Sequence, residues 1–344
     1  MKTFQWAVIG AGPAGMAALG RLIDLGVPSE QIAWIDPLFQ VGDLGAQWQS
    51  ISSNTKVDLF VKFLLGYKAF QYAQCETSYP LHQLDPNQTC LLKFVVEPLL
   101  WVTKRLQSQV QVIQSTVLQL KMEQRHWQLT LQEGQIQSKN VVLAIGAEPR
   151  VMPSTVPVIP LADALHKDRL PLAVNEQDTV AVFGTSHSAI IVIRLLLESN
   201  VKKIINFYRG PLRYAVYLDD FILFDNTGLK GETAAWAREH IDGKISDRLT
   251  RVWLDETNTA AYLPQCTKSI QAIGFNRRAL PIEGLPVINY NDKSGIIAPG
   301  LFGCGIAFPE STIDAFANVE SSVGLWKFMH YLNRVVPVWQ KYEP

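Results

Sequence analysis

The chain has 344 residues, enough for two or three ordinary domains, and 48% of its residues are hydrophobic, enough to build extended cores. Lys and Arg together number 31, as do Asp and Glu, so the formal charge is +0. No segment concentrates basic residues as nucleic-acid-binding proteins do, which excludes that class and leaves a small molecule as the expected partner. The oligomeric state stays open.

The sequence also argues against a membrane protein and a metal protein. No uninterrupted apolar run approaches the about 18 residues that suggest a membrane span, and the chain starts directly with a strand instead of a signal peptide. The four cysteines, Cys75, Cys90, Cys266 and Cys304, are widely spaced, with no Cys-x-x-Cys pair and no grouping with histidines. We therefore expect a soluble cytoplasmic protein with reduced thiols and no metal site.

The chain opens with a strand, turn, helix and second strand. Residues 6–9 form an apolar strand, residues 10–15 read Gly-Ala-Gly-Pro-Ala-Gly, and a helix to about residue 25 precedes a strand at 32–35. This G-x-G-x-x-G turn predicts a dinucleotide site, because its glycines let the backbone approach a pyrophosphate at the helix N-terminus. A carboxylate after the second strand suits ribose hydroxyls. The residues expected to bind are Gly10, Gly12, Pro13, Ala14, Gly15 and Asp36.

The middle of the chain predicts antiparallel strands and then a domain boundary. Residues 110–145 alternate between apolar and polar side chains and end in a buried strand before Gly146, which we expect at the cofactor. Prolines cluster between residues 149 and 171, as is typical of a connection between domains.

A second strand–turn–helix–strand unit follows, with strands at 180–183 and 203–208 around a looser turn. Serine and alanine replace its second and third glycines, and a serine hydroxyl there can cap the helix or contact a phosphate. An arginine after the second strand suits a ribose 2′-phosphate and favours NADPH over NADH, unless it is only an exposed loop cation. We expect a neutral, structural histidine in this turn. The expected cofactor residues are Gly184, Ser186, His187, Ser188, Ala189 and Arg209.

These turns resemble those of known flavoproteins. The first turn is similar to the FAD-binding start of two-domain flavoproteins, which include glutathione reductase and flavin-dependent monooxygenases, and the second to the NADPH turn of N-hydroxylating monooxygenases. Residues 41–48 and 53–56 resemble the Gly-Gly-x-Trp and Asn-Thr-Ser-Lys region of flavin-containing monooxygenases. The resemblance implies that Gln47 and Trp48 lie at the cofactor and that Asn54 is a catalytic candidate beside the flavin, although a turn asparagine is the alternative.

Near the C-terminus the resemblance is partial. Residues 301–310 stand where disulfide reductases carry a Gly-Asp pair that closes the FAD site, which places Gly303 and Gly305 at the cofactor. Residues 300–323 predict a strand, a glycine turn and a helix. The Cys pair of the disulfide reductases is absent, and residues 160–170 keep only the His of the signature Phe-x-Gly-x-x-x-His-x-x-x-Tyr of the monooxygenases.

The predicted fold class is α/β, with two Rossmann-like three-layer (ββα) dinucleotide-binding domains, the second inserted in the first. Residues 1–160 and 276–344 would bind FAD, and residues 161–275, with an aromatic segment at 208–253, would bind NADPH. That segment lines a substrate cavity, covers the nicotinamide or is an ordinary surface insertion. The resemblance implies an FAD-dependent oxidoreductase in which NADPH reduces the flavin and oxygen, for monooxygenation of a small molecule, or an organic acceptor takes the electrons. The alternative is a low-turnover flavin-binding protein that acts as a redox-responsive interaction module.

Overall fold

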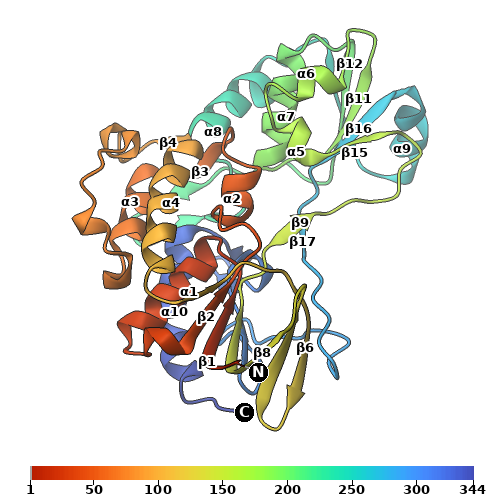
Figure 1. Cartoon of the computed structure of the whole chain (residues 1–344). Coiled ribbons are helices and arrows are strands. Elements are labelled where there is room, and N and C mark those ends of the chain that lie inside the picture. Colours follow the sequence, from red (N-terminus) through yellow and green to blue (C-terminus); the bar gives the residue numbers. More distant parts are fainter. Residues whose placement is uncertain (1) are drawn as a thin grey trace.

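Two β-sheets organise the chain in a computed structural model that describes residues 2–344 (Figure 1). The larger sheet has the strand order β18-β19-β8-β1-β2-β5, and β6 and β7 extend it from β8 as an antiparallel hairpin. Its strands are β1 (Lys2–Ile9), β2 (Ile32–Ile35), β5 (Gln111–Ile113), β6 (Val117–Glu123), β7 (His126–Leu131), β8 (Gln135–Leu143), β18 (Ile296–Ala298) and β19 (Leu301–Gly303).

Helices cover one face of this sheet, and the β6–β7 hairpin folds back from β8 over the other face, so that the unit has three layers. Alternate residues of β1 point to opposite faces: Trp6 and Val8 pack against helices, and Ala7 and Ile9 pack against the β6–β7 hairpin layer. The helical layer contains α1 (Pro13–Asp24), α3 (Val57–Leu65), α4 (Lys93–Gln107) and α10 (Leu325–Trp339). Helix α1 starts at a proline, whose fixed φ suits the first helical position and whose missing N–H costs no hydrogen bond there.

The smaller sheet is entirely parallel. Its order is β10-β16-β11-β12-β15, with α7 (His187–Glu198) and α8 (Gly231–Ala237) packed on one face and α9 (Glu256–Tyr262) near the other. The strands are β10 (Val158–Ile159), β11 (Thr179–Phe183), β12 (Lys203–Tyr208), β15 (Leu249–Trp253) and β16 (Lys268–Gln271). The chain enters and leaves this unit through an antiparallel pair, β9 (Ala147–Pro149) with β17 (Phe275–Arg277). The predicted α/β fold with an inserted second unit is confirmed.

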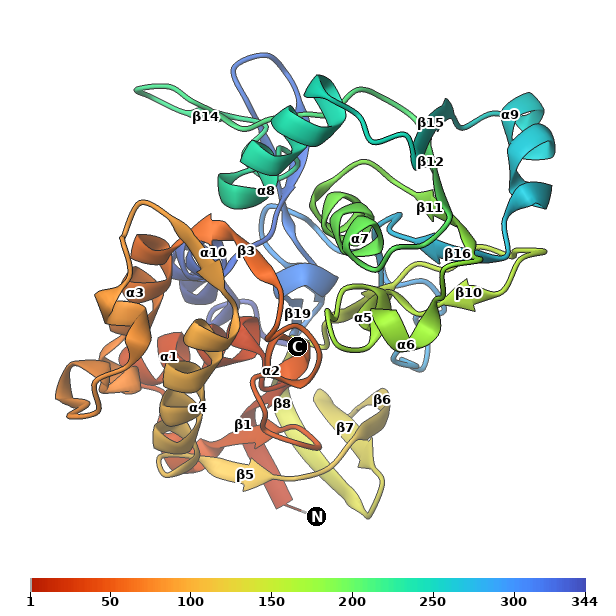
Figure 2. The ribbon, with the colours of Figure 1, turned by 90° about the horizontal axis from the view of Figure 1, so that it is seen from above.

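Two hairpins lie beside each other at the edge of the molecule that is uppermost in Figure 2. They are β13 (Val216–Tyr217) with β14 (Ile222–Leu223), and β20 (Glu310–Ile313) with β21 (Val319–Ser322). The helix predicted within residues 300–323 is therefore only a single 3₁₀ turn at Gly305–Ala307: the hairpin follows it, and α10 starts only at Leu325. Thr312, Ile313 and Val319 are β-branched and favour strands, and the Asp314 carboxylate accepts backbone N–H groups of the turn.

The remaining elements are short. They are α2 (Gly42–Ala46), β3 (Ser52–Lys56), β4 (Thr89–Leu91), α5 (Leu161–Ala164), α6 (Leu170–Ala173), a π-helix at Arg238–Gly243, and 3₁₀ helices at Ser29–Gln31, Lys68–Phe70, Tyr72–Gln74, Pro80–Gln83, Leu263–Gln265 and Gly305–Ala307. Within residues 2–344, no helix is both long and apolar enough to cross a membrane.

Candidate functional site

The first glycine turn is built by close backbone contacts. Gly10 has φ +107°, and a Cβ placed on it would lie 2.3 Å from the carbonyl oxygen of Ala144. A Cβ on Gly15 would lie 2.0 Å from the Gly10 oxygen, so both positions exclude a side chain. Gly12 differs, because a Cβ there would come no closer than 3.9 Å to another residue, the Cα of Gly42. Gly10 and Gly15 therefore serve packing, whereas Gly12 keeps an open wall at the N-terminus of α1.

Asp36 fixes the same turn from the end of β2. Its Oδ2 accepts a hydrogen bond from the Ala11 N–H at 2.8 Å, and its Oδ1 accepts from the N–H groups of Leu38 and Phe39 at 2.8 and 2.7 Å. A carboxylate offers about four lone-pair positions. These three bonds leave capacity for a ligand hydroxyl at the side chain that sequence reasoning assigned to a ribose.

Two cavities adjoin this turn. One has a volume of about 400 Å³ and the other about 350 Å³, each within the range of ligand sites in proteins. Both are lined by Gly10, Asp36, Gly42, Asp43, Ile145 and Arg278. The cavities thus meet in front of α1. The larger reaches toward Trp48 and α10, and the smaller passes Pro37 and residues 115–117.

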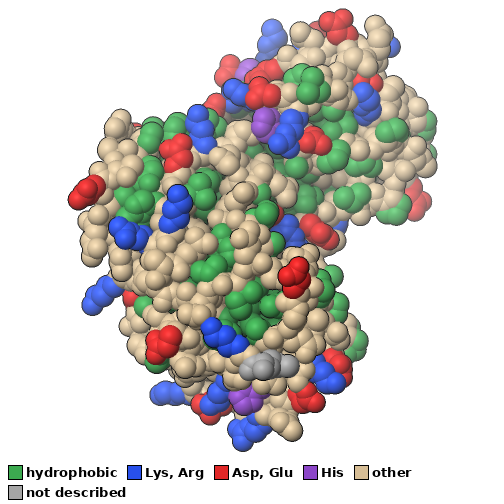
Figure 3. All heavy atoms as spheres, viewed as in Figure 1, with side chains coloured by type: hydrophobic (Ala, Val, Ile, Leu, Met, Phe, Trp, Pro, Cys, Tyr) green, Lys and Arg blue, Asp and Glu red, His purple; other side chains and the backbone are tan. Residues whose placement is uncertain are grey.

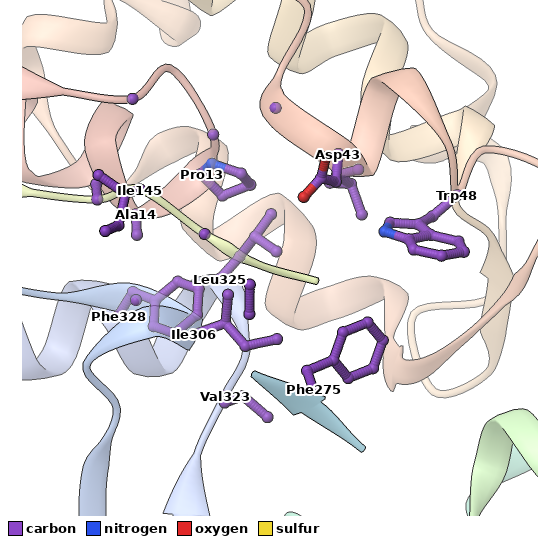
Figure 4. A pocket seen from close by; sticks show the side chains of 18 of the residues that line it. Pro13, Ala14, Asp43, Trp48, Ile145, Phe275, Ile306, Val323, Leu325 and Phe328 are labelled. Atoms are coloured by element: carbon purple, nitrogen blue, oxygen red, sulfur yellow. The ribbon is translucent and has the colours of Figure 1, made fainter. Parts of the chain in front are cut away.

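The far end of the larger cavity is apolar (Figure 4). The rings of Trp48 and Phe275 are perpendicular with centroids 6.3 Å apart, and they face side chains from the C-terminal segment. Those side chains are Ile306, Val323, Leu325 and Phe328. The molecule is narrowest where the two units meet, and hydrophobic side chains are exposed just below this narrow part (Figure 3). The site therefore joins a polar turn to an apolar chamber.

Many of the predicted cofactor residues come together here. Those that line the larger cavity are Gly10, Gly12, Pro13, Ala14, Asp36, Trp48, Gly146, Ser188 and Gly305. Gly15 and Gly303 are instead packing positions, because a Cβ on Gly303 would lie 2.3 Å from the Phe308 ring. Gln47 is off the cavity wall, where its Nε2 donates a hydrogen bond to the Asp43 carboxylate at 3.3 Å.

The second glycine turn repeats the construction of the first. Gly184 has φ +123°, and a Cβ on it would lie 2.3 Å from the carbonyl oxygen of Ala272, which follows the neighbouring strand as Ala144 does in the first unit. Ala189 at the third glycine position is fully buried. The Ser186 side chain makes no capping hydrogen bond, so the expected serine cap is absent at this residue. The hydroxyl and the first amides of α7 are left for a ligand.

His187 links the two units. Its Nε2 donates to the carbonyl oxygen of Ser52 in β3 at 2.9 Å. Burial lowers the pKa of His187, and the hydrogen bond to Ser52 opposes that shift only partly. The imidazole is therefore neutral at physiological pH and acts as a structural contact between β3 and the second turn.

Arg251 is a functional candidate that sequence reasoning missed. Its Nε donates to Asn206 Oδ1 at 3.0 Å, and its guanidinium lies 4.6 Å from the centre of the Tyr208 ring. The Nη2 atom is buried and has no hydrogen-bond partner in residues 2–344. Arg209, the predicted phosphate ligand, is exposed just after β12. The sequence does contain an arginine in the strand that pairs with β12. Only the pairing of Asn206 with Arg251, however, brings this arginine to the second glycine turn.

A full-length relative decides the family. The monooxygenase AgnR1 of Paecilomyces divaricatus is 33% identical over 383 aligned positions, which cover 96% of this chain and 97% of that protein. The chain belongs to this monooxygenase family. The predicted enzyme class is thereby confirmed. No family profile matches the chain.

Solved structures agree on the fold of this family member. A double mutant of a flavin monooxygenase from Stenotrophomonas maltophilia aligns with a TM-score of 0.67 at 13% identity, over 99% of both chains. The bacillithiol disulfide reductase Bdr of Staphylococcus aureus aligns with a TM-score of 0.60 at 12% identity, also over 99% of both chains. The monooxygenase family member thus has the two-dinucleotide-binding-domain fold that flavin monooxygenases share with flavoprotein disulfide reductases.

The four described cysteines of this family member decide whether a disulfide could carry electrons. All four described cysteines are unpaired. Cys304 lines the larger cavity near Ala14, with its Sγ 3.9 Å from the Ala14 oxygen, and burial raises the pKa of its thiol to about 12. The thiol is therefore protonated at neutral pH and is a poor nucleophile. Among residues 2–344 there is also no cluster of His, Cys, Asp and Glu suited to a metal.

Asn54 lies outside both cavities, on β3 beside the aromatic segment. Its Nδ2 donates to the Gly228 carbonyl at 3.2 Å, and its Oδ1 is buried with no hydrogen-bond partner in the described chain. Lys230 and Lys327 hold the Asp225 carboxylate of the adjoining loop at 2.5 and 2.6 Å. The aromatic segment therefore orients the Asn54 side chain, a contact that resemblance alone did not indicate.

Proposed function

We propose that this chain is an FAD-dependent monooxygenase that takes its electrons from NADPH. Residues 1–160 and 276–344 would bind FAD, and residues 161–275 would bind NADPH. The observation that carries this proposal is the pair of cavities that share a wall at Gly10 and Asp36 of the first glycine turn, next to the open wall that Gly12 gives the larger cavity. An elongated dinucleotide with a polar middle and two flat ends matches two chambers joined at a helix N-terminus.

Different described residues would bind the different parts of FAD. The backbone N–H groups of Gly12 and Ala14 at the start of α1 would face the diphosphate, and Asp36 retains lone pairs for the adenosine ribose. The smaller cavity, beside Pro37 and residues 115–117, would take the adenine. The apolar chamber with Trp48 and Phe275 would take the ring system and keep water away from it.

NADPH would bind at the second glycine turn. Its diphosphate would contact the N-terminus of α7 at Ser186 and Ser188, and the 2′-phosphate would accept hydrogen bonds from the Arg251 guanidinium, whose Nη2 has no partner in the described chain. The exposed Arg209 would add charge at the same end of the sheet. Ligands of parallel sheets bind at the carboxyl ends of the strands, which is where Ser186, Ser188 and Arg209 follow β11 and β12.

The chemistry follows from the two nucleotides, and the protein orients them. When bound, FAD supplies a hydride acceptor for NADPH and a donor to oxygen or to a small organic acceptor. Membership of a monooxygenase family favours oxygen as the acceptor and a small molecule as the substrate. Because the described thiols are unpaired and the Cys304 thiol is protonated, no internal disulfide is proposed to carry electrons.

The test is simultaneous measurement of NADPH and oxygen consumption by the FAD-loaded chain. We expect NADPH oxidation with matched oxygen uptake. NADPH oxidation that starts only when a quinone is added would assign an organic acceptor instead of oxygen. Holoprotein that oxidises NADPH under neither condition would contradict the proposed function.

A further inference from the structure

Arg278 and Asp43 form an ion pair at the junction of the two cavities. The Arg278 Nη2 lies 2.8 Å from Asp43 Oδ2 and 2.9 Å from Oδ1, and both residues line both cavities. The Asp43 carboxylate points into the larger cavity, across from Pro13 (Figure 4). Gly146 leaves room for the guanidinium, since a Cβ there would lie 3.0 Å from Arg278 Nη1.

With Arg278 paired to Asp43, the charges around this junction do not favour the binding of a diphosphate. Among the described residues that line the two cavities, Arg278 is the only lysine or arginine. The same walls contain two acidic residues, Asp36 and Asp43. The first turn of α1 contains no acidic side chain, and the only lysine or arginine of the helix is Arg21, in its last turn. A diphosphate at Gly12 would therefore depend on backbone amides unless Arg278 leaves Asp43.

We propose that Arg278 is a diphosphate ligand that Asp43 holds in place until FAD binds. The inference rests on the proposed FAD site. On binding, Arg278 exchanges the carboxylate for phosphate oxygens, to which a guanidinium can donate two parallel N–H hydrogen bonds. Breaking the ion pair costs little free energy, because the side chains of Arg278 and Asp43 are 38% and 22% exposed and partly exposed ion pairs contribute little to stability.

This exchange gives the two partners opposite effects on affinity. Removing Arg278 deletes a ligand of the diphosphate, whereas removing the Asp43 charge deletes a competitor of the diphosphate and a repulsive charge. If the pair only joined α2 to residues 276–344, both substitutions would weaken FAD binding. The sign of the Asp43 variant therefore separates a ligand role from a structural tie.

The experiment is a fluorescence titration of the flavin-free chain with FAD and, separately, with riboflavin, which lacks phosphate. We expect Arg278→Gln to weaken FAD about tenfold or more and to leave riboflavin unchanged. Arg278→Lys keeps the charge and should recover part of the loss. Asp43→Asn should tighten FAD several-fold. The control Arg150→Gln removes an exposed guanidinium that contacts Asn276 and lines neither cavity, so it should change neither affinity.

Circular dichroism of each variant checks that it is folded. Equal losses of FAD affinity in Arg278→Gln and Asp43→Asn, or a parallel loss for riboflavin, would overturn the exchange. Wild-type protein that binds FAD while Arg278→Gln binds it equally well would overturn this inference alone. Wild-type protein that binds no FAD would overturn the proposed function, and the inference with it.

Discussion

The Asn54 side chain donates a hydrogen bond to the carbonyl oxygen of Gly228 at 3.2 Å, although the two residues are 174 positions apart. The loop that carries Gly228 is tied to the C-terminal segment, because Lys327 contacts the Asp225 carboxylate at 2.6 Å and Glu320 accepts a hydrogen bond from the backbone of the same loop. The orientation of Asn54 thus depends on contacts among three distant parts of the chain.

Replacing Lys327 tests this tie. Lys327→Met leaves Asp225 with Lys230 alone, and we expect the free energy of unfolding to fall by about 1–3 kcal/mol, less than for a fully buried pair because both side chains are more than a quarter exposed. Urea unfolding measures the change. Lys62→Met removes an exposed pair with Asp58 and should cost less than about 0.5 kcal/mol. Equal effects of the two substitutions would argue against the tie.

Substitution of Gly12 should separate ligand binding from folding. A Cβ at Gly12 meets no protein atom closer than 3.9 Å and the backbone φ is −75°, so Gly12→Ala should fold normally. The methyl group would occupy the space proposed for the diphosphate and should abolish FAD retention, measured by absorbance after desalting. Gly210→Ala, with nothing within 4 Å, is the matched control. Full retention of FAD by Gly12→Ala would mean that the diphosphate does not bind at this turn.

Arg251 should control the choice of nicotinamide nucleotide. We expect Arg251→Gln to weaken NADPH about tenfold or more and NADH little, because only NADPH carries the 2′-phosphate. Arg209→Ala should show the same preference with a smaller effect, since Arg209 is exposed. Calorimetric titration of each variant with both nucleotides measures this. Equal losses for NADPH and NADH would assign Arg251 to packing against Tyr208.

Asp178 should contribute to acid unfolding. Burial alone would raise its pKa, but hydrogen bonds from Lys268 and Thr267 outweigh burial and hold the pKa of Asp178 below its ordinary value of 3.8. A carboxyl group with a lowered folded-state pKa stabilises the protein fully above its unfolded pKa and loses that contribution as the pH falls below it. We therefore expect wild-type stability to decline more steeply below about pH 4 than that of Asp178→Asn, in urea unfolding at stepped pH. Parallel pH profiles would contradict this.

The features that could be predicted from sequence are local ones. The turn at Gly10 and the carboxylate at Asp36 are specified within one βαβ unit, whose spacing is fixed by the strand and helix between them. The second turn was found by the same means despite Ser186. The family resemblance drew attention to Trp48, which does line the cavity.

The features that sequence reasoning missed are contacts between distant segments. Asp43 and Arg278 are 235 positions apart, and no periodicity along the chain relates them. Arg251 reaches the second turn only because β15 pairs with β12 in one particular register. The catalytic role of Asn54 stays a prediction, but the contact of its side chain with Gly228 was not foreseen. Each case depends on how separate units pack, which local propensity does not specify.

Flavin uptake tests the central claim most directly. Purified chain is mixed with excess FAD, desalted, and examined by absorbance, with NADPH then added in the absence of oxygen. The cavities at the first glycine turn predict one retained FAD per chain and loss of the oxidised-flavin absorbance on adding NADPH. Folded chain that emerges from desalting without flavin would contradict the account.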